Sequence, residues 1–595
     1  MAALGARTLG HVVFAACTFG CGTASPDGEG SLVGIAKSAL VVSEQAKLTA
    51  SDGATYDDFS RSHVGLFGDT ALVGARGAAV GTKPDQGAAY VYVRAGSAWS
   101  LQQKLTAADG ALADGFGNAV ALGPDTALVG ASGDTIGTVQ SQGSAYVFVR
   151  AGTTWSQQQK LTASDGAMGG AFGYSLSLSG DTALVGAMGD LSAKGAAYVF
   201  TRSGTTWSQQ QKLTAADGAA SDWFGAAVSV AGDTAFVAAY GDDVGANENQ
   251  GSVYVFTRSG TTWSQQQKLT AADGAAVDDF GFRIALGSDT ALIGAMSGDV
   301  GANANQGAAY VFARSGGVWS QQQKLVASNG ATNDFFGRSV GLVGDTAAIG
   351  AYVDDVGANQ DQGSVYIFAR SGGSWAQKAQ VTASDGSAGD YFGESLALDG
   401  STLVVGAFGD DVGAASNAGA AYVFAVKKSD GNVCAGTTEC TSGFCVDGVC
   451  CATACAGGSG DCTACSVALG AATDGTCGPT TGNPCAGGTC QSGTCQPSGT
   501  AGAGGAVSSG GSGGDAASQG GAPGGGTAGD SAAAGGSPAA GAPSGGQQGR
   551  AGSSDEGGCQ CRAAGAGRDP LALRGLALAL LGLAGMARRV KRSRQ

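Results

Sequence analysis

An all-β fold, a seven-bladed β-propeller of four-stranded blades, is predicted by three features of the sequence. A self-similar unit recurs seven times, with spacings of 57, 56, 52, 56, 56 and 56 residues. Each unit contains four short strand patterns, and the 595 residues include 108 glycines but only 13% charged residues. Repeats of about 50 residues indicate small sheets that bury their faces against their neighbours. Such a composition favours short strands and tight turns over long helices.

The repeat also predicts how the ring closes. Its marker residues are Lys47, Lys104, Lys160, Lys212, Lys268, Lys324 and Gln380. Only six units carry the blade tryptophan, which recurs as Trp99, Trp155, Trp207, Trp263, Trp319 and Trp375. The chain leaves the pattern after Phe424 without a fourth strand, whereas 45–50 has the pattern of a fourth strand with no blade before it. We therefore expect this N-terminal strand to complete the seventh blade and to remove both exposed sheet edges.

Within one unit, strands are predicted at 224–230, 234–239, 252–257 and 263–270. Apolar residues occupy both alternating sets of positions in the middle strands, as expected for a blade packed between two others. A Gly-Asp-Thr turn connects the first two strands, and an Arg-Ser-Gly turn connects the last two.

Phe-Gly pairs followed by Leu-Val-Gly-Ala, as at 184–187, resemble FG-GAP repeats. The pairs include Phe116-Gly117, Phe172-Gly173, Phe280-Gly281 and Phe392-Gly393. This resemblance implies the seven-bladed propeller of integrin α chains. The calcium-binding blades of that family carry an Asp-rich loop between the first two strands, where this sequence has only the short turn. The family's metal ligands therefore do not carry over, and we interpret Asp69, Asp181, Asp233 and Asp345 as turn residues.

The longer connections, after the second and fourth strands, are expected at one end of the propeller and are rich in aspartate. The candidate ligand-face residues are Asp242, Asp243, Asp299, Asp354, Asp355, Asp410 and Asp411. Calcium is considered as a cofactor, with Asp278, Asp279, Asp242 and Asp243 as candidate ligands. The alternative is that these residues serve turn formation and solubility, because the loops lack the ligand spacing of an EF-hand.

Several function classes are disfavoured by the composition. The sequence has two histidines, His11 in the expected signal segment and His63, which we expect on a strand surface. No histidine pair is therefore left for metal or acid–base chemistry, and there is no phosphate-loop motif, so we expect no enzyme. The formal net charge of -15 argues against nucleic acid as a partner.

The N-terminal and cysteine-rich segments predict export. Residues 1–24 have the pattern of a signal peptide, with Cys17 and Cys21 as candidate lipidation sites, and 25–44 is expected to be a tether before a propeller at 45–427. Twelve of the 16 cysteines fall in 428–496, a segment that resembles cysteine-rich modules of predatory soil bacteria. Six disulfides are expected among Cys434, Cys440, Cys445, Cys450, Cys451, Cys455, Cys462, Cys465, Cys477, Cys485, Cys490 and Cys495.

The C-terminal third predicts a spacer and an anchor. Residues 497–557 are dominated by glycine, alanine and serine and are expected to form a flexible linker. In 558–595, Cys559 precedes an apolar run at 571–587 and a basic tail. This arrangement resembles the myxobacterial C-terminal sorting signal, which implies processing near Cys559; a permanent membrane anchor is the alternative.

Together these features predict a non-catalytic binding or adhesion protein at the bacterial cell surface or outer membrane. Its Asp-rich face would be presented to an extracellular protein or polysaccharide. A structural envelope component without a specific ligand and an extracellular hydrolase are the alternatives.

Overall fold

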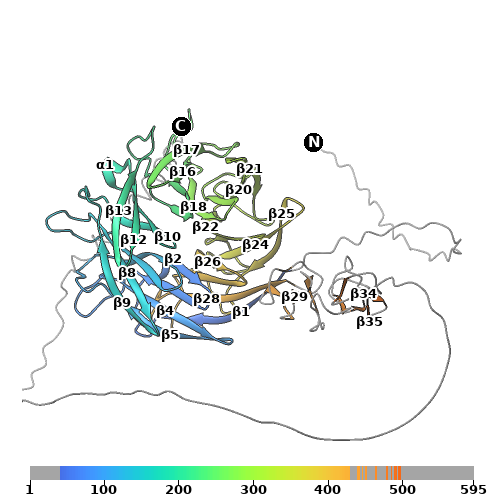
Figure 1. Cartoon of the computed structure of the whole chain (residues 1–595). Coiled ribbons are helices and arrows are strands. Elements are labelled where there is room, and N and C mark those ends of the chain that lie inside the picture. Colours follow the sequence, from blue (N-terminus) through green and yellow to red (C-terminus); the bar gives the residue numbers. More distant parts are fainter. Residues whose placement is uncertain are drawn as a thin grey trace, which may run out of the picture. The chain divides into compact units, whose positions relative to one another are not determined.

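The computed structural model describes residues 40–428 as one continuous segment (Figure 1). Beyond it, the described residues are 434, 439–442, 445–446, 449–451, 463–464, 478–479, 484–485, 488–491 and 494–497. The expected signal peptide, the linker, the sorting segment and Cys17, Cys21 and Cys559 lie outside the described residues. No helix in the described part of the chain is long and apolar enough to cross a membrane.

Residues 40–428 form seven four-stranded antiparallel sheets around a central axis, which confirms the predicted fold. Blade 1 consists of β2 (Phe59–Phe67), β3 (Thr70–Ala75), β4 (Ala88–Ala95) and β5 (Ala98–Leu105). Blade 2 consists of β6 (Phe116–Leu122), β7 (Thr126–Ala131), β8 (Ser144–Ala151) and β9 (Thr154–Leu161). Blade 3 consists of β10 (Phe172–Ser179), β11 (Thr182–Ala187), β12 (Ala196–Ser203) and β13 (Thr206–Leu213), with the short helix α1 (Asp190–Ala193) between β11 and β12.

The other four blades repeat this arrangement. Blade 4 consists of β14 (Val228–Ala231), β15 (Thr234–Ala239), β16 (Ser252–Ser259) and β17 (Thr262–Leu269). Blade 5 consists of β18 (Phe280–Leu286), β19 (Thr290–Ala295), β20 (Ala308–Ser315) and β21 (Val318–Leu325). Blade 6 consists of β22 (Phe336–Val343), β23 (Thr346–Ala351), β24 (Ser364–Ser371) and β25 (Ser374–Val381). Blade 7 consists of β26 (Phe392–Asp399), β27 (Thr402–Ala407), β28 (Ala420–Lys428) and β1 (Leu40–Leu48).

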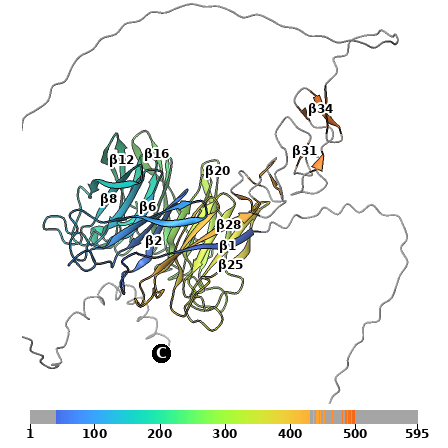
Figure 2. The same ribbon diagram turned by 90° about the horizontal axis from the view of Figure 1, so that it is seen from below.

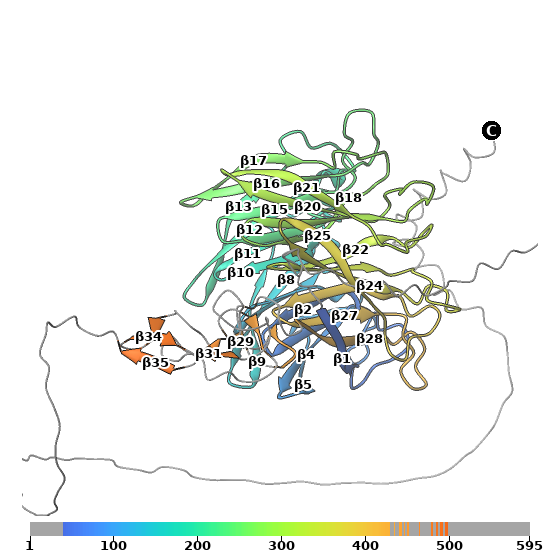
Figure 3. The ribbon, with the colours of Figure 1, turned by 90° about the vertical axis from the view of Figure 1, so that its right-hand side faces the viewer.

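The closure of blade 7 by the N-terminal strand is confirmed. The strand order is β1-β28-β27-β26, and β1 lies antiparallel to β28 with Leu40 opposite Lys428 and Leu48 opposite Ala421 (Figure 2, Figure 3). The strand begins at Leu40, so residues 40–44 of the expected tether pair within the propeller.

The strand pattern of blade 4 is confirmed for β15, whereas its first strand is shorter than the predicted 224–230. Regular pairing begins only at Val228. Phe224 instead makes an isolated bridge to Gly195 of blade 3, and Gly225 donates its N–H to Ala238 O at 2.8 Å. The segment before Val228 therefore follows an irregular path while remaining bonded to its blade.

In six of the seven blades a Phe-Gly pair fastens the blade to its predecessor, as Phe116 and Gly117 illustrate; blade 1 has Phe59-Ser60 at this position. The buried Phe116 ring packs edge-to-face on Tyr146 and Phe148, with centroids 5.4 and 6.0 Å away. Gly117 has φ of +94°, and a Cβ at this position would lie 2.3 Å from the carbonyl oxygen of Ala88 in blade 1. Glycine is therefore required here both by the backbone conformation and by the close approach of the neighbouring blade.

The two tight turns of a blade hold each other and the preceding blade. In blade 3, Arg202 donates from Nε to Asp181 Oδ1 at 2.6 Å and from Nη1 to Thr126 Oγ1 of blade 2 at 2.9 Å. The same guanidinium lies 5.4 Å from the ring centroid of Trp207. Equivalent ion pairs are Arg94–Asp69, Arg150–Asp125, Arg258–Asp233, Arg314–Asp289 and Arg370–Asp345. Asp181 and its equivalents therefore lie in turns, as we interpreted them, and accept hydrogen bonds from arginine.

Glutamines on the fourth strands fasten the outer edges of neighbouring blades. Gln211 donates from Nε2 to Trp263 O at 2.7 Å, and its Oε1 accepts the Trp263 N–H at 2.8 Å. The side-chain amide thus donates one hydrogen bond to the tryptophan backbone and accepts one from it, as the backbone of a paired residue does in an antiparallel sheet. The other pairs of this kind are Gln103–Trp155, Gln159–Trp207, Gln267–Trp319 and Gln323–Trp375.

At both borders of blade 7 the glutamine position is occupied by alanine. The register of the fourth strands places Ala46 and Ala379 where other blades have the amide. Leu40, Val42 and Ala379 instead pack against the apolar core of blade 7. At its border with blade 6, the outer edge of the closing blade is therefore held by apolar contact and by the hydrogen bonds from Ser384 to Glu44 instead of an amide clamp.

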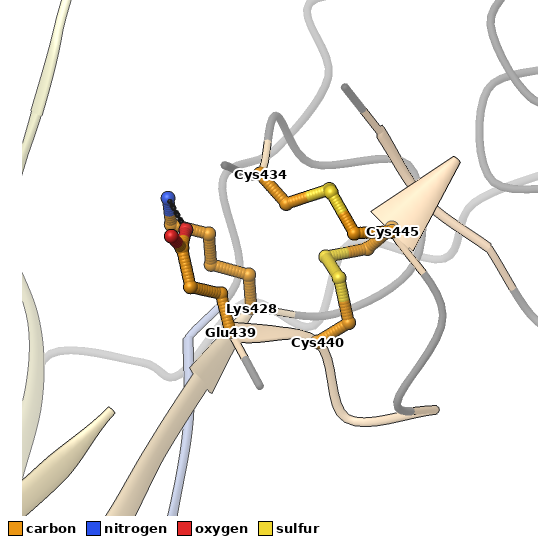
Figure 4. The surroundings of a disulfide bond; sticks show 6 residues. Lys428, Cys434, Glu439, Cys440 and Cys445 are labelled. Atoms are coloured by element: carbon orange, nitrogen blue, oxygen red, sulfur yellow. Dashed lines mark hydrogen bonds and ion pairs between the residues drawn. A yellow bond between two sulfur atoms is a disulfide. The ribbon is translucent and has the colours of Figure 1, made fainter. Parts of the chain in front are cut away.

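The cysteine-rich segment begins directly after β28. Thr441 donates its N–H to Lys428 O at 2.9 Å, and Lys428 Nζ pairs with Glu439 at 2.8 Å (Figure 4). Disulfides link Cys434 to Cys445 and Cys440 to Cys450, which confirms a disulfide-rich segment, and Cys451 is also disulfide-bonded. The bonds predicted for Cys455, Cys462, Cys465, Cys477, Cys485, Cys490 and Cys495 lie outside what the structure describes.

Short strands continue through this segment. They are β29 (Cys445–Val446), β30 (Val449–Cys450), β31 (Thr463–Ala464), β32 (Gly478–Pro479), β33 (Pro484–Cys485), β34 (Gly488–Gln491) and β35 (Thr494–Pro497). They pair as β29-β30, β31-β32 and β33-β34-β35.

Candidate functional site

The Asp-rich connections lie at one end of the propeller, called here the loop end. It is formed by the links between second and third strands, such as 240–251, and between fourth and first strands, such as 270–279. The two tight turns of each blade lie at the opposite end, because consecutive strands are antiparallel.

Much of the aspartate at the loop end is tied into networks with lysine and tyrosine. In blade 4, Lys268 Nζ lies 2.7 Å from Asp217 Oδ2 and 2.6 Å from Asp242 Oδ2. Tyr254 donates its hydroxyl to Asp217 Oδ1 at 2.9 Å, and Ser252 donates to Asp242. Asp242 is buried, so this candidate ligand-face carboxylate serves the interior of the blade.

The charge balance of this network is visible in its pKa shifts. Burial acts to lower the pKa of Lys268, but its hydrogen bonds with Asp217 and Asp242 outweigh burial and raise it. Burial acts to raise the pKa of Asp217, but hydrogen bonds from Lys268 and Tyr254 outweigh it and hold that pKa below its usual range. Both partners are therefore charged at neutral pH.

The candidate ligand-face residues fall into two groups. Asp354 and Asp410 are buried in the same way as Asp242. The other four aspartates are exposed, and each accepts a backbone N–H six residues further along its own loop: Asp243 from Asn249, Asp299 from Asn305, Asp355 from Asp361 and Asp411 from Asn417. Only this second group is presented to solvent.

The calcium candidates do not converge on a common point. Asp278 accepts the Ala275 N–H at 2.7 Å, whereas Asp279 accepts the Ser297 hydroxyl. Among the described residues, the only three His, Cys, Asp or Glu side chains whose ligand atoms lie within 4.8 Å of one another are Cys434, Cys440 and Cys450. Their sulfurs belong to disulfides, so this group is structural.

A hollow of about 330 Å³ lies at the loop end of blade 6, and we call it the blade-6 hollow. Its lining includes Asn329, Asn333, Asp334, Asp354, Asp355 and Asp361, and none of its lining residues is basic. Asn329 and Gln380 occupy the positions that hold aspartate and lysine in blade 4, and Gln380 Nε2 donates to Asp354 Oδ2 at 3.1 Å. Asp354 thus has a neutral partner where Asp242 has an ammonium.

One departure from the repeat marks this hollow in the sequence, but we predicted no site there. Gln380 is the one marker residue of the seven that is not lysine. Glutamine in place of lysine removes a positive charge from blade 6. The effect on the hollow depends on the contact between Gln380 and Asp354, which are distant from each other in sequence.

Burial raises the pKa of Asp334, which lines this hollow, to about 6, and the charges of Asp354 and Asp355 add to the shift. A carboxyl with a raised pKa in the folded state contributes stability below its unfolded pKa, and this contribution is lost as the pH rises through about 6. The Asp334→Asn variant keeps an oxygen for the Ala331 N–H that Asp334 now accepts. We expect its melting temperature to exceed that of the parent at pH 7.5 and to match it near pH 4. A difference independent of pH, or an equal shift in the exposed control Asp243→Asn, would contradict this.

A second cavity, of about 200 Å³, lies on the propeller axis, and we call it the axial cavity. Residues from the first strands of all seven blades line it. His63 lies here, with Nδ1 3.0 Å from Asn118 O, so the expectation of a strand-surface position was wrong. Burial, followed by the charge of Arg283, lowers the pKa of His63 to about 3, so its ring is neutral at physiological pH.

Comparison with protein-family models places the repeats in a known family. The model described as FG-GAP repeat matches residues 42–92, 99–148, 155–200, 207–256, 263–312, 319–368 and 375–424. A comparison with curated proteins gives no match. The matched segments cover more than half of the 595 residues, and each match runs from a fourth strand into the third strand of the next blade. The chain therefore belongs to the FG-GAP repeat family.

Proposed function

We propose that this chain is an exported, non-catalytic binding protein whose ligand docks at the loop end, in the blade-6 hollow. FG-GAP propellers typically serve as binding modules, and loops on a rigid scaffold are well suited to that role. The observation that carries the proposal is the lining of the hollow, which combines four aspartates with asparagine and glutamine and includes no basic side chain.

This lining favours a ligand that offers many hydrogen-bond donors. Carboxylates are acceptors only, and amide oxygens add further acceptors. A polysaccharide presents hydroxyl donors in a regular array, so we propose an extracellular polysaccharide in preference to a protein partner.

The absence of catalysis is part of the proposal. A raised carboxyl pKa in a hollow is a feature of glycosidase acids, but the environment of Asp334 is not particular to this site. Asp390 has a pKa of about 6 for the same reason, burial, and accepts the Ser387 N–H just as Asp334 accepts that of Ala331. The repeated arrangement supports a structural role for Asp334 in its loop.

Export is supported by the disulfides Cys434–Cys445 and Cys440–Cys450, because such bonds persist in oxidising compartments. We propose a cell-surface location on this basis. Mass spectrometry of the mature protein would test it by reporting lipid on Cys17 or Cys21 and cleavage near Cys559; a chain recovered from the cytosol with both termini intact would contradict it.

The binding proposal is tested by titrating the full chain with a panel of soluble bacterial polysaccharides, using Asp355→Ala and a matched control. Asp243→Ala removes the equivalent carboxylate from blade 4 and, like Asp355→Ala, one side-chain bond to a backbone N–H. We expect Asp355→Ala to weaken binding by about tenfold, the size of one lost hydrogen bond to a charged group. Binding should be unchanged in Asp243→Ala. Equal loss in both variants, or no saturable binding to any polysaccharide, would refute the proposal.

A further inference from the structure

The axial cavity contains a positive charge that the fold itself does not neutralise. Arg283 lines the cavity from β18, and the corresponding first-strand positions in blades 3, 4, 6 and 7 are Ser175, Ala227, Ser339 and Ser395. A small residue is therefore sufficient for the fold at this position, and the large cation of blade 5 needs another explanation.

Glu394, a carboxylate that acts on this guanidinium, is bound to another arginine. Arg338 donates from Nε to Glu394 Oε2 at 2.8 Å and from Nη2 to Oε1, so both oxygens of Glu394 are engaged. Arg283 donates from Nη1 to Phe282 O at 3.0 Å and makes no ion pair with any carboxylate among the described residues. Both guanidiniums lie over the Phe282 ring, at 4.9 and 4.5 Å from its centroid.

Neighbouring groups do not cancel this charge. Burial and the proximity of Arg338 lower the pKa of Arg283 to about 10, so it remains charged at physiological pH. His63 is neutral there, and the carboxylate of Asp279 accepts the Ser297 hydroxyl and makes no ion pair with Arg283. At the start of β2 a similar excess occurs, because Arg61 and Arg76 share the carboxylate of Asp58. Arg283 is therefore a positive charge in the lining of the axial cavity of a chain whose net charge is -15.

A cation that lines a cavity and has no carboxylate partner is costly unless a counter-ion joins it. We infer that the axial cavity binds the carboxylate of a small organic acid, with Arg283 as its principal partner. One unpaired guanidinium matches a single carboxylate in charge and in its bidentate geometry. The cavity adds serine hydroxyls, from Ser62 and Ser229, as further donors.

The tautomer of His63 indicates which kind of organic acid fits the axial cavity. A carbonyl cannot donate, so the contact with Asn118 O requires the proton on Nδ1. Nε2 of the neutral ring is then an acceptor. A hydroxy acid, which offers a hydroxyl donor beside its carboxylate, fits this pair of groups, and lactate is a suitable probe. This site is separate from the blade-6 hollow, so it stands or fails independently of the proposed function.

The test measures the melting temperature of the full chain in lactate, chloride or inorganic phosphate at matched ionic strength. Isothermal titration then measures the affinity for lactate. We expect lactate, but not chloride, to raise the melting temperature. Arg283→Ser, which installs the residue found in blades 3, 6 and 7, should weaken lactate binding by at least about tenfold. It should also melt in chloride no lower than the parent. The control Lys194→Ser removes an exposed cation that does not line the axial cavity, and it should leave lactate binding unchanged.

Three results would overturn the inference. They are equal melting of the parent in lactate and chloride, unchanged lactate affinity in Arg283→Ser, and a preference for phosphate over lactate. If Arg283→Ser fails to fold, Arg283→Lys keeps the charge but not the planar fork, and it should still bind lactate more weakly than the parent. Full lactate affinity in Arg283→Lys would refute bidentate recognition.

Discussion

Removal of residues 40–48 is expected to abolish the cooperative unfolding of the propeller and to leave much of the protein aggregated. Without β1, the row of backbone groups on β28 becomes an unpaired edge between two blades. Leu48, which is only 3% exposed, is lost from the core, and truncation of one such residue to alanine alone costs about 2–5 kcal/mol. Loss of Lys47 also leaves the buried Asp410 without its ammonium partner.

Circular dichroism and size-exclusion chromatography of the deleted chain would measure this effect. The matched control lacks 1–39 and retains β1; it should unfold at the temperature of the parent. Equal melting of the two shortened chains would show that closure by β1 does not stabilise the ring.

Replacement of Lys268 by glutamine is expected to lower the free energy of unfolding by about 2 kcal/mol. Removing one partner of a fully buried ion pair costs about 3–5 kcal/mol. The cost should be smaller here because the Lys268 side chain is 26% exposed and that of Asp217 is 52% exposed. Asp242, by contrast, is buried, and without Lys268 its remaining hydrogen-bond partners would be neutral groups.

Blade 6 suggests a double variant that would separate the contribution of the Lys268–Asp217 contact from the rest of this loss of stability. Asn329 and Gln380 occupy there the positions of Asp217 and Lys268, so the double variant Asp217→Asn with Lys268→Gln copies an arrangement that this chain already contains. In a double-mutant cycle followed by urea unfolding, we expect the two changes to cost less together than the sum of their separate costs. Strict additivity would indicate that the Lys268–Asp217 contact contributes nothing to stability.

The seven-bladed ring was predictable from the sequence because the pattern that specifies one blade is repeated along the chain. Six of the seven units show the Phe-Gly pair, six show both tight turns, and the unmatched strand at the N-terminus allows only one way to complete blade 7. Strand limits were less predictable in blade 4, where Phe224 leaves the regular ladder while its side chain stays buried.

The candidate site was predictable only in part, because neighbouring residues in one loop have opposite environments. Asp242 and Asp243 are adjacent, yet one is buried beside Lys268 and the other is exposed. Which of them faces the lysine depends on a contact between separate strands, which the local pattern does not reveal. His63 was misplaced for a related reason. The sequence separation between Phe59 and Thr70 is one residue longer than that between Phe116 and Thr126. The pairing of β2 with β3 is irregular between Phe59 and Val64.

The position of β28 between β1 and β27 also determines how the propeller responds to mechanical force. Leu40 and Lys428 are opposite each other, so pulling on the chain at these two residues would peel β1 from β28 one bond at a time, which requires little force. A load that enters at the loop end and leaves through Lys428 acts differently, because it runs along β28. The hydrogen bonds to β1 and β27 then share that load in shear on both sides of the strand.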